Sequence, residues 1–237
     1  NDVINGENEV NDEEEVNDKV DKNEIDNEEE INDENNSDDL DESIDDISYE
    51  DELDLQDADI ALYAVDDVFE VGSLTYKVLS DDTVQVGDGD TAMTGLTGSV
   101  TIPSTVKYGG TTYNVTAIGD RAFLRCSDIT SLEIPDTVTT IGELALADIG
   151  VSTITIPDSV ETLGDNVLSG ASMTSVTLSS KLITIPDRAF NSCPNLREVT
   201  IPDSVTKIET YAFNSCSSLT TITIPKNVEY IGKQAFW

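Results

Sequence analysis

The chain contains no histidine and only three cysteines among its 237 residues. Histidine is the commonest general base and metal ligand near neutral pH, so its absence removes the Ser-His-Asp arrangement and most metal sites. The cysteines lack the close pairing of zinc motifs, and neither a P-loop nor a G-x-G-x-x-G is present. Apolar runs stay short of the roughly 18 residues that a membrane span needs. We therefore expect no enzyme activity, no metal, no cofactor and no direct membrane insertion.

Basic residues are also scarce, since 12 Lys and Arg stand against 49 Asp and Glu, which gives a formal net charge of −37. Such a chain repels nucleic-acid phosphates and anionic membrane surfaces. The first 67 residues contain 30 of the acids, and their few aliphatic residues are isolated. Because this composition cannot bury enough apolar surface, residues 1–67 are predicted to be a largely disordered acidic leader. A solvated spacer, a loose calcium-binding segment and a docking tail for a basic partner all fit this composition.

An internal repeat of 22 or 23 residues organises the rest of the chain. Apolar and polar residues alternate before each Ile-Pro, which predicts a short strand that the proline ends. The Ala-Phe pair that follows predicts a short helical turn on the opposite side. Stacked repeats bury the apolar face that one repeat leaves exposed. Two columns define the period: Ile102, Ile134, Ile156, Ile201 and Ile224 before proline, and Ala122, Ala145, Val167, Ala189, Ala212 and Ala235 in the turn.

Some copies depart from this pattern. The first Ile-Pro step is longer by about nine residues, and Gly109-Gly110 in that surplus predicts a hairpin turn. The fourth repeat has Leu178-Ser179 in place of Ile-Pro, and Ile185-Pro186 in place of the usual Ile-Gly. A stack of repeats needs a polar end cap, and none follows Phe236. We therefore expect the repeats to continue past Trp237 in a longer protein.

The two most regular copies are LREVTIPDSVTKIETYAFNSCSS (196–218) and LTTITIPKNVEYIGKQAFW (219–237). Their shared pattern, L-x-x-V-x-I-P-x-x-V-x-x-I-G-x-x-A-F-x-x-C, resembles the BspA-type leucine-rich repeat family over residues 96–237. The resemblance implies a β-rich leucine-rich-repeat solenoid with parallel strands on one face. The short helical turns opposite and the disordered acidic leader, both inferred above from the residues, complete the expected fold. The resemblance also implies a β-hairpin N-cap over residues 68–98 and about six repeats over residues 99–237. Members of that family are typically secreted or surface-attached, and several are regarded as adhesins, so a secreted or cell-surface location is implied too.

The three cysteines share one column of the repeat, which also holds Ile149 and Ala171. Small apolar residues at equivalent positions favour buried free thiols at Cys126, Cys193 and Cys216. A disulfide between Cys193 and Cys216 on adjacent repeats remains the alternative.

The outward strand positions form the candidate binding surface. Glu133 and Glu198 are its only carboxylates, and three coils at about 4.8 Å each separate them by about 14 Å, which is too far for a glycosidase pair. Polar β-branched residues also suit any exposed strand face, and the two tyrosines included here also suit packing on the cap. The candidates are Thr101, Ser131, Glu133, Thr153, Thr155, Ser175, Thr177, Glu198, Thr200, Thr221 and Thr223, with Tyr108 and Tyr113 as aromatic anchors.

These features favour a monomeric, non-enzymatic module for extracellular or cell-surface binding and adhesion. Its extended strand face would meet a protein, glycoprotein or glycan partner, because the concave surfaces of solenoids are suited to extended contacts. The alternative is a structural spacer in a larger surface protein whose binding or catalytic activity lies elsewhere.

Overall fold

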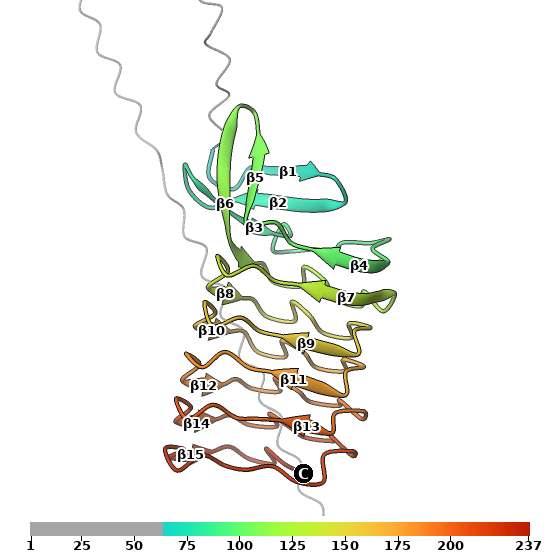
Figure 1. Cartoon of the computed structure of the whole chain (residues 1–237), viewed down its shortest axis with the longest axis vertical. Helices are drawn as coiled ribbons and strands as arrows, with labels where there is room; N and C mark the ends of the chain where they lie inside the picture. Colours follow the sequence, from blue (N-terminus) through green and yellow to red (C-terminus); the bar gives the residue numbers. More distant parts are fainter. Residues whose placement is uncertain (1–63) are drawn as a thin grey trace, which may run out of the picture. The chain divides into compact units, whose positions relative to one another are not determined.

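The computed structural model describes residues 64–237, which belong to one compact unit. The acidic leader predicted for residues 1–67 lies outside the described residues, apart from residues 64–67, which form no strand. Within residues 64–237 the fold consists of strands and turns, as expected for leucine-rich repeats (Figure 1).

The chain enters this fold through an antiparallel hairpin of β1 (Val68–Val71) and β2 (Leu74–Val78). β3 (Thr83–Val86) pairs with β2 on one side and, in parallel, with the long strand β6 (Thr111–Ile118) on the other. β5 (Thr105–Tyr108) and β6 form a second hairpin. The two residues between them, Gly109 and Gly110, have φ values of 53° and 82°. Two positive φ angles are the signature of a type I′ turn, so the predicted hairpin turn is confirmed.

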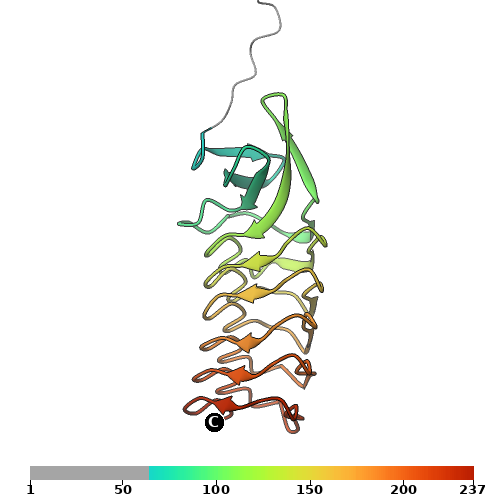
Figure 2. The same cartoon turned by 90° about the vertical axis from the view of Figure 1, so that its left-hand side faces the viewer.

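After β6 the chain winds in coils that each contribute to three sides of the stack. One side carries the strands that precede the Ile-Pro position, and a second side carries the strands that follow it (Figures 1 and 2). The first set is β4 (Gly98–Thr101), β7 (Ile129–Glu133), β9 (Thr153–Thr155), β11 (Ser175–Thr177) and β13 (Glu198–Val199). The second set is the end of β6, β8 (Thr140–Ile141), β10 (Thr162–Leu163), β12 (Thr184–Ile185), β14 (Lys207–Ile208) and β15 (Tyr230–Ile231), and we call this side the second face.

The third side is built from turns, and the predicted helical turns are wrong for the described residues, which contain no helix. Non-glycine residues with φ between 52° and 62° recur around each Ala-Phe position, and a left-handed residue interrupts a right-handed helix. The chain therefore folds as successive tight turns. These residues are Arg121, Arg125, Leu144, Asp148, Asn166, Arg188, Ser192, Tyr211, Ser215 and Gln234.

Backbone hydrogen bonds join these turns from coil to coil, and within each turn three N–H groups donate to the next coil. The N–H groups of Arg121, Phe123 and Arg125 donate to the carbonyl groups of the next coil, each at 2.8 Å. The same triplet recurs down to Ser215, whose N–H donates to the carbonyl of Trp237 at 2.7 Å. A left-handed residue begins and ends each triplet, as Arg121 and Arg125 do, and the turns form a ladder of their own.

The core lies between the three sides and consists of stacked columns of apolar side chains. Phe190 stacks on Phe213 with a centroid distance of 5.0 Å and an interplanar angle of 10°. Phe213 stacks in turn on Phe236 at 5.3 Å and 4°. Aromatic pairs of this kind add to the stabilisation that burial alone provides. The same column higher in the stack holds Leu146, Leu168 and Phe123, all fully buried.

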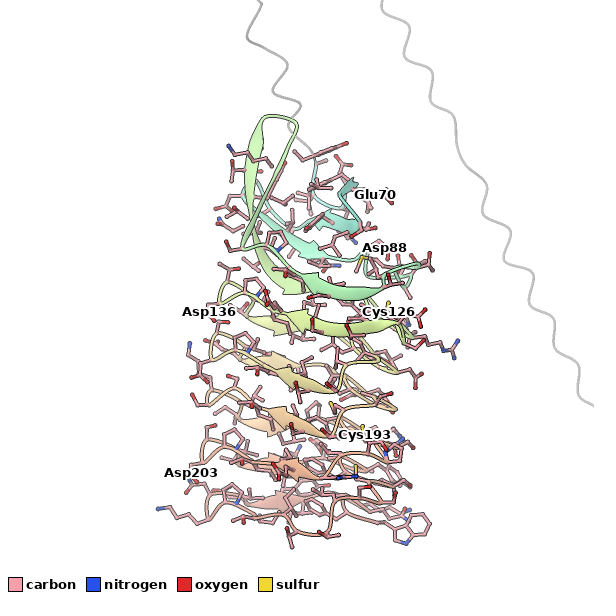
Figure 3. The ribbon with its side chains drawn as sticks, turned by 45° about the vertical axis from the view of Figure 1, so that its right-hand side comes forward. Glu70, Asp88, Cys126, Asp136, Cys193 and Asp203 are labelled. Atoms are coloured by element: carbon pink, nitrogen blue, oxygen red, sulfur yellow. The ribbon has the colours of Figure 1, made fainter. Side chains whose placement is uncertain are left out.

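The cysteine column is buried and its three thiols are free, so the disulfide alternative is wrong. Figure 3 shows Cys126 and Cys193 at the same corner of the stack. Cys193 and Cys216 donate hydrogen bonds to the carbonyls of Leu168 and Phe190 in the preceding coil, at 3.1 and 3.0 Å. Burial raises the pKa of Cys126, and a hydrogen bond with Cys216 followed by burial raises that of Cys193. These thiols therefore serve as small core side chains.

Candidate binding surface

The outward side chains that precede each Ile-Pro position form one polar surface, which we call the front surface. Its members are all exposed except Ser175, which is half-buried. Their inward neighbours, such as Val100, Leu132 and Ile154, are buried, so the alternation of the sequence places the polar set outward. The front surface comprises Ser99, Thr101, Ser131, Glu133, Thr153, Thr155, Ser175, Thr177, Glu198, Thr200, Thr221 and Thr223.

Strand register brings equivalent members of the front surface together. Ser99 pairs with Ser131 and Thr101 with Glu133 between β4 and β7. The Ser131 hydroxyl donates to the Ser99 hydroxyl at 2.7 Å, and the Thr101 hydroxyl donates to Oε2 of Glu133 at 3.0 Å. These contacts fix the directions of the side chains and leave further lone pairs and donors for a partner.

The same register continues lower in the stack. Thr153 pairs with Ser175 and Thr155 with Thr177 between β9 and β11, and Ser175 also pairs with Glu198 on β13. β9 and β11 thus lie between Glu133 and Glu198 in coil order, so these two carboxylates do not meet, in agreement with their predicted separation.

The front strands do not form one continuous sheet. β4 and β7 pair with each other, and β9, β11 and β13 form a separate group. Thr200, Thr221 and Thr223 lie outside strands, although their repeats read as strands in sequence. The coil that carries Thr221 makes no strand pair with β13, and a hollow of about 490 Å³ opens between them. Glu198, Thr200, Thr221 and Thr223 line this hollow.

A second hollow, of about 320 Å³, opens at the other end of the front surface. Ser99 and Thr101 line it together with Ser73, Leu74 and Leu96 from the N-terminal segment. No sequence pattern points to these last three residues, because their closeness to β4 depends on how the hairpin of β1 and β2 packs on the first coil. The predicted residues therefore border a hollow at each end of the front surface.

The two tyrosines do not belong to the front surface. Tyr113 is only 2% exposed, so its selection as an exposed anchor was wrong. Its side chain points inward from β6 and packs near Phe69, with ring centroids 5.9 Å apart. Tyr108 is half-buried and stacks on Phe69 at 4.2 Å with an interplanar angle of 3°. Both rings thus pack on the N-terminal hairpin, which is the alternative that the sequence left open.

The coils in the middle of the stack contain acids but no bases, although two of these acids pair with flanking bases: Asp148 with Arg125 at 3.9 Å and Glu161 with Lys181 at 3.5 Å. No Lys or Arg occurs between Arg125 and Lys181. Figure 3 shows one of the acids, Asp136, on the side of the stack away from the cysteine corner, with Asp203 below it. These coils therefore carry an excess of negative charge. The eight acids in this interval are Asp128, Glu133, Asp136, Glu143, Asp148, Asp158, Glu161 and Asp165.

Some of these carboxylates bond to the backbone of the next coil. Asp158 accepts a hydrogen bond from the N–H of Ser180 at 2.7 Å, and this bond lowers the pKa of Asp158. At a different repeat position, directly after glycine, Asp165 and also Asp120 of the preceding coils accept hydrogen bonds from the N–H groups of Asp187 and Glu143, at 3.2 and 2.7 Å. These acids act as links between coils. Across residues 64–237 no three His, Cys, Asp or Glu side chains gather as metal ligands would. The same residues contain no helix that is long and apolar enough to cross a membrane.

Solved structures of bacterial proteins resemble this fold. A leucine-rich cell-surface protein from Faecalibacterium prausnitzii A2-165 is 30% identical, over 72% of this chain and 52% of that protein, with a TM-score of 0.53. A leucine-rich repeat protein from Bacteroides capillosus ATCC 29799 is 31% identical, over 65% of this chain and 96% of that one, with a TM-score of 0.40. A leucine-rich repeat protein from Bacteroides ovatus ATCC 8483 is 22% identical, over 69% and 55%, with a TM-score of 0.43.

The chain spans about half the length of the F. prausnitzii and B. ovatus proteins. No curated protein matches it in sequence. The BspA-type leucine-rich repeat region, in six copies, matches residues 116–237, which is more than half of the chain. The chain therefore belongs to the BspA-type leucine-rich repeat family.

Proposed function

We propose that residues 64–237 form a non-enzymatic solenoid module that binds a protein or glycoprotein partner through the front surface. The module would act outside the cell or at its surface, as the related cell-surface protein of F. prausnitzii suggests. Adhesion is the process that such a surface would serve.

The observation that carries this proposal is the in-register row of exposed hydroxyl and carboxylate groups on a stiff stack of coils. Ser and Thr side chains have few rotamers to lose when a partner binds, so each weak contact costs little ordering entropy. The hydrogen bonds of Ser131 and Thr101 hold their groups in place before binding. The hollows at the two ends offer room for protruding side chains of the partner.

Charge narrows the choice of partner. Of the eight acids between Arg125 and Lys181, only Asp148 and Glu161 pair with a base, so the excess negative charge of these coils favours a basic partner surface. Electrostatic steering of this kind speeds association and weakens as salt rises. Contacts to the hydroxyl groups would persist at physiological salt.

Biolayer interferometry against extracellular-matrix glycoproteins, mucins and bacterial polysaccharides tests the proposal. The informative variant is Thr155→Arg/Thr177→Arg, which places two long side chains on neighbouring exposed positions of β9 and β11. Its matched control, Thr139→Arg/Thr140→Arg, adds the same charge to exposed positions of the second face.

We expect a partner that binds the full chain and loses at least about tenfold affinity for the front variant while the control binds normally. Equal losses in both variants would point to net charge, not to the front surface. Failure of every panel member to bind would favour the structural-spacer alternative.

A further inference from the structure

The second face carries an interruption at a level where the front strands β9 and β11 remain paired. Its strands form two separate groups, β6–β8–β10 and β12–β14–β15, and β10 does not pair with β12 (Figure 2). On both sides of this break the coils pair normally, Thr140 with Thr162 above and Thr184 with Lys207 below. The break lies between coil three (residues 151–172) and coil four (residues 173–195).

Pro186 accounts for the break. In other coils the residue at its position donates a backbone hydrogen bond to the coil before it, for example Gly164 to Ile141 at 2.8 Å and Gly232 to Ile208 at 2.7 Å. Proline has no N–H, so the carbonyl of Leu163 receives no bond from coil four. A Cβ atom at Gly164 would lie 2.4 Å from the backbone nitrogen of Glu143, which shows how closely the coils approach in this column. A proline ring therefore needs a wider separation as well.

The separation also leaves a donor without a partner. The N–H groups equivalent to that of Ile183 donate to the preceding coil, as Glu161 does to Thr139 and Thr206 does to Ile183, both at 2.9 Å. Within the described residues the N–H of Ile183 makes no such bond to Glu161. Coils three and four thus face each other with one unpaired amide donor and unpaired carbonyl acceptors, where every other pair of coils on this face is bonded.

A hollow of about 670 Å³ opens at the same place. Its lining includes Leu163 from coil three and Ile183 from coil four, and Lys181 and Glu161 form an ion pair across it at 3.5 Å. Ile183 is 54% exposed. The equivalent positions hold Thr139, Glu161, Thr206 and Glu229, so this is the only aliphatic residue in a polar column. An exposed aliphatic side chain therefore occurs at the same place as the missing backbone hydrogen bonds between β10 and β12.

We propose that this hollow is a second binding site, which takes an extended peptide segment of a partner protein. One aliphatic side chain of the peptide packs against Ile183 and Leu163. The peptide backbone supplies an acceptor for the N–H of Ile183 and a donor for the carbonyl of Leu163. A charged side chain on the peptide competes for Lys181 or Glu161 at the rim.

The lining favours a peptide over a sugar. A peptide carries donor and acceptor groups at the spacing of a backbone, and unpaired strand groups bind such segments through main-chain hydrogen bonds. Sugar sites of high affinity commonly use aromatic platforms, and no aromatic side chain lines this hollow. Its volume falls within the range of small-molecule and side-chain pockets, about 300–1,000 Å³.

The experiment selects binders from a phage-displayed library of random linear peptides on the immobilised full chain. The strongest peptide is then synthesised, and its affinity is measured by calorimetry for the wild type and three variants. Ile183→Thr replaces the aliphatic residue with the residue found at Thr139 and Thr206. Pro186→Gly introduces the residue found at the equivalent position of coil three, Gly164, and with it the missing N–H. Thr155→Arg/Thr177→Arg is the control, because it alters the front surface alone.

We expect Ile183→Thr to weaken peptide binding at least about tenfold. Pro186→Gly should weaken binding similarly and raise the urea midpoint of unfolding, because the two coils can close and regain their hydrogen bonds. The front-surface control should bind the peptide normally, which separates this site from the proposed function. The proposal is overturned if the library yields no binder, or if the peptide binds both second-face variants as tightly as the wild type. A parallel screen on a sugar array would also overturn it if the only ligand whose binding Ile183→Thr weakens is a sugar.

Discussion

The stacked phenylalanines of the last three coils allow the packing to be tested by a pair of matched substitutions. Phe213 is 2% exposed and lies between Phe190 and Phe236, whose ring centroids are 5.0 and 5.3 Å away. Phe213→Leu keeps most of the apolar volume and removes both ring contacts. At about 0.5–1.5 kcal/mol for each aromatic pair, the expected loss in free energy of unfolding is about 1–3 kcal/mol. Phe213→Ala also leaves a cavity and should cost about 3–5 kcal/mol.

Phe123 supplies the control, because it is fully buried in the same column and stacks on no other ring among the described residues. Its neighbours in the column, Leu146 and Leu168, show that leucine fits there, so Phe123→Leu should cost less than Phe213→Leu. Urea unfolding followed by circular dichroism reports the whole stack, and the fluorescence of Trp237, the single tryptophan, reports the last coil. Equal losses for the two leucine variants would refute the reasoning that the stacked rings add to burial.

Three further outcomes are expected. The three thiols should resist a water-soluble disulfide reagent in the native protein and react fully in urea, because Cys126, Cys193 and Cys216 are buried; rapid native labelling would contradict the column. Gly164→Ala should lower the free energy of unfolding, measured in urea, by about 1–3 kcal/mol, because the new methyl group meets Glu143 N at 2.4 Å, whereas Glu209→Ala at the equivalent position should not. Partial burial acts to raise the pKa of Asp88, but hydrogen bonds from Thr91 and Asp90 outweigh it and lower that pKa below the ordinary value of 3.8. The stability that Asp88 contributes is therefore present above that value and is lost as the pH falls through the lower folded value. Asp88→Asn should accordingly flatten the acid limb of a stability–pH profile, and an unchanged limb would contradict the assignment.

The period of the sequence was enough to predict a stack of coils and the outward set on the front surface, and the resemblance to the BspA-type family predicted the leucine-rich repeat fold. Each coil meets the same kind of neighbour above and below, so similar residues recur at equivalent positions of the repeat. The chemistry shared by those residues therefore indicates whether the position is buried or exposed. The hairpin turn at Gly109-Gly110 was also readable, because two positive φ angles in succession require residues such as glycine. These features depend on local chemistry or on nearest-neighbour stacking.

Other features depend on contacts that no column reveals. The left-handed turn residues include Arg121, Leu144 and Tyr211, which have no common chemistry, so a helical turn was the natural interpretation. Hydrogen bonds to the next coil hold them in that conformation, and those bonds appear only when coils are stacked. Tyr113 was misplaced for a related reason, since its burial comes from Phe69 in a different hairpin.

Pro186 is visible in the sequence as a departure from the repeat, but its effect on the hydrogen bonds between coils three and four is apparent only in the structure. Coil four lacks proline after its first strand, where Ser179 is buried and donates a hydrogen bond to the carbonyl of Val160 at 2.6 Å, and it has proline after its second strand. Its front strand β11 still pairs on both sides, and its turn still accepts the bond from Leu168 N to Ala189 O at 2.9 Å. Backbone hydrogen bonds therefore join coil four to coil three at the front strands and at the turns, but not at the second face. The local loss amounts to two backbone hydrogen bonds, at about 0.5–1.5 kcal/mol each. A stack of this size can tolerate that loss, which is why the gap can form without disrupting the fold and why a glycine at residue 186 should close it.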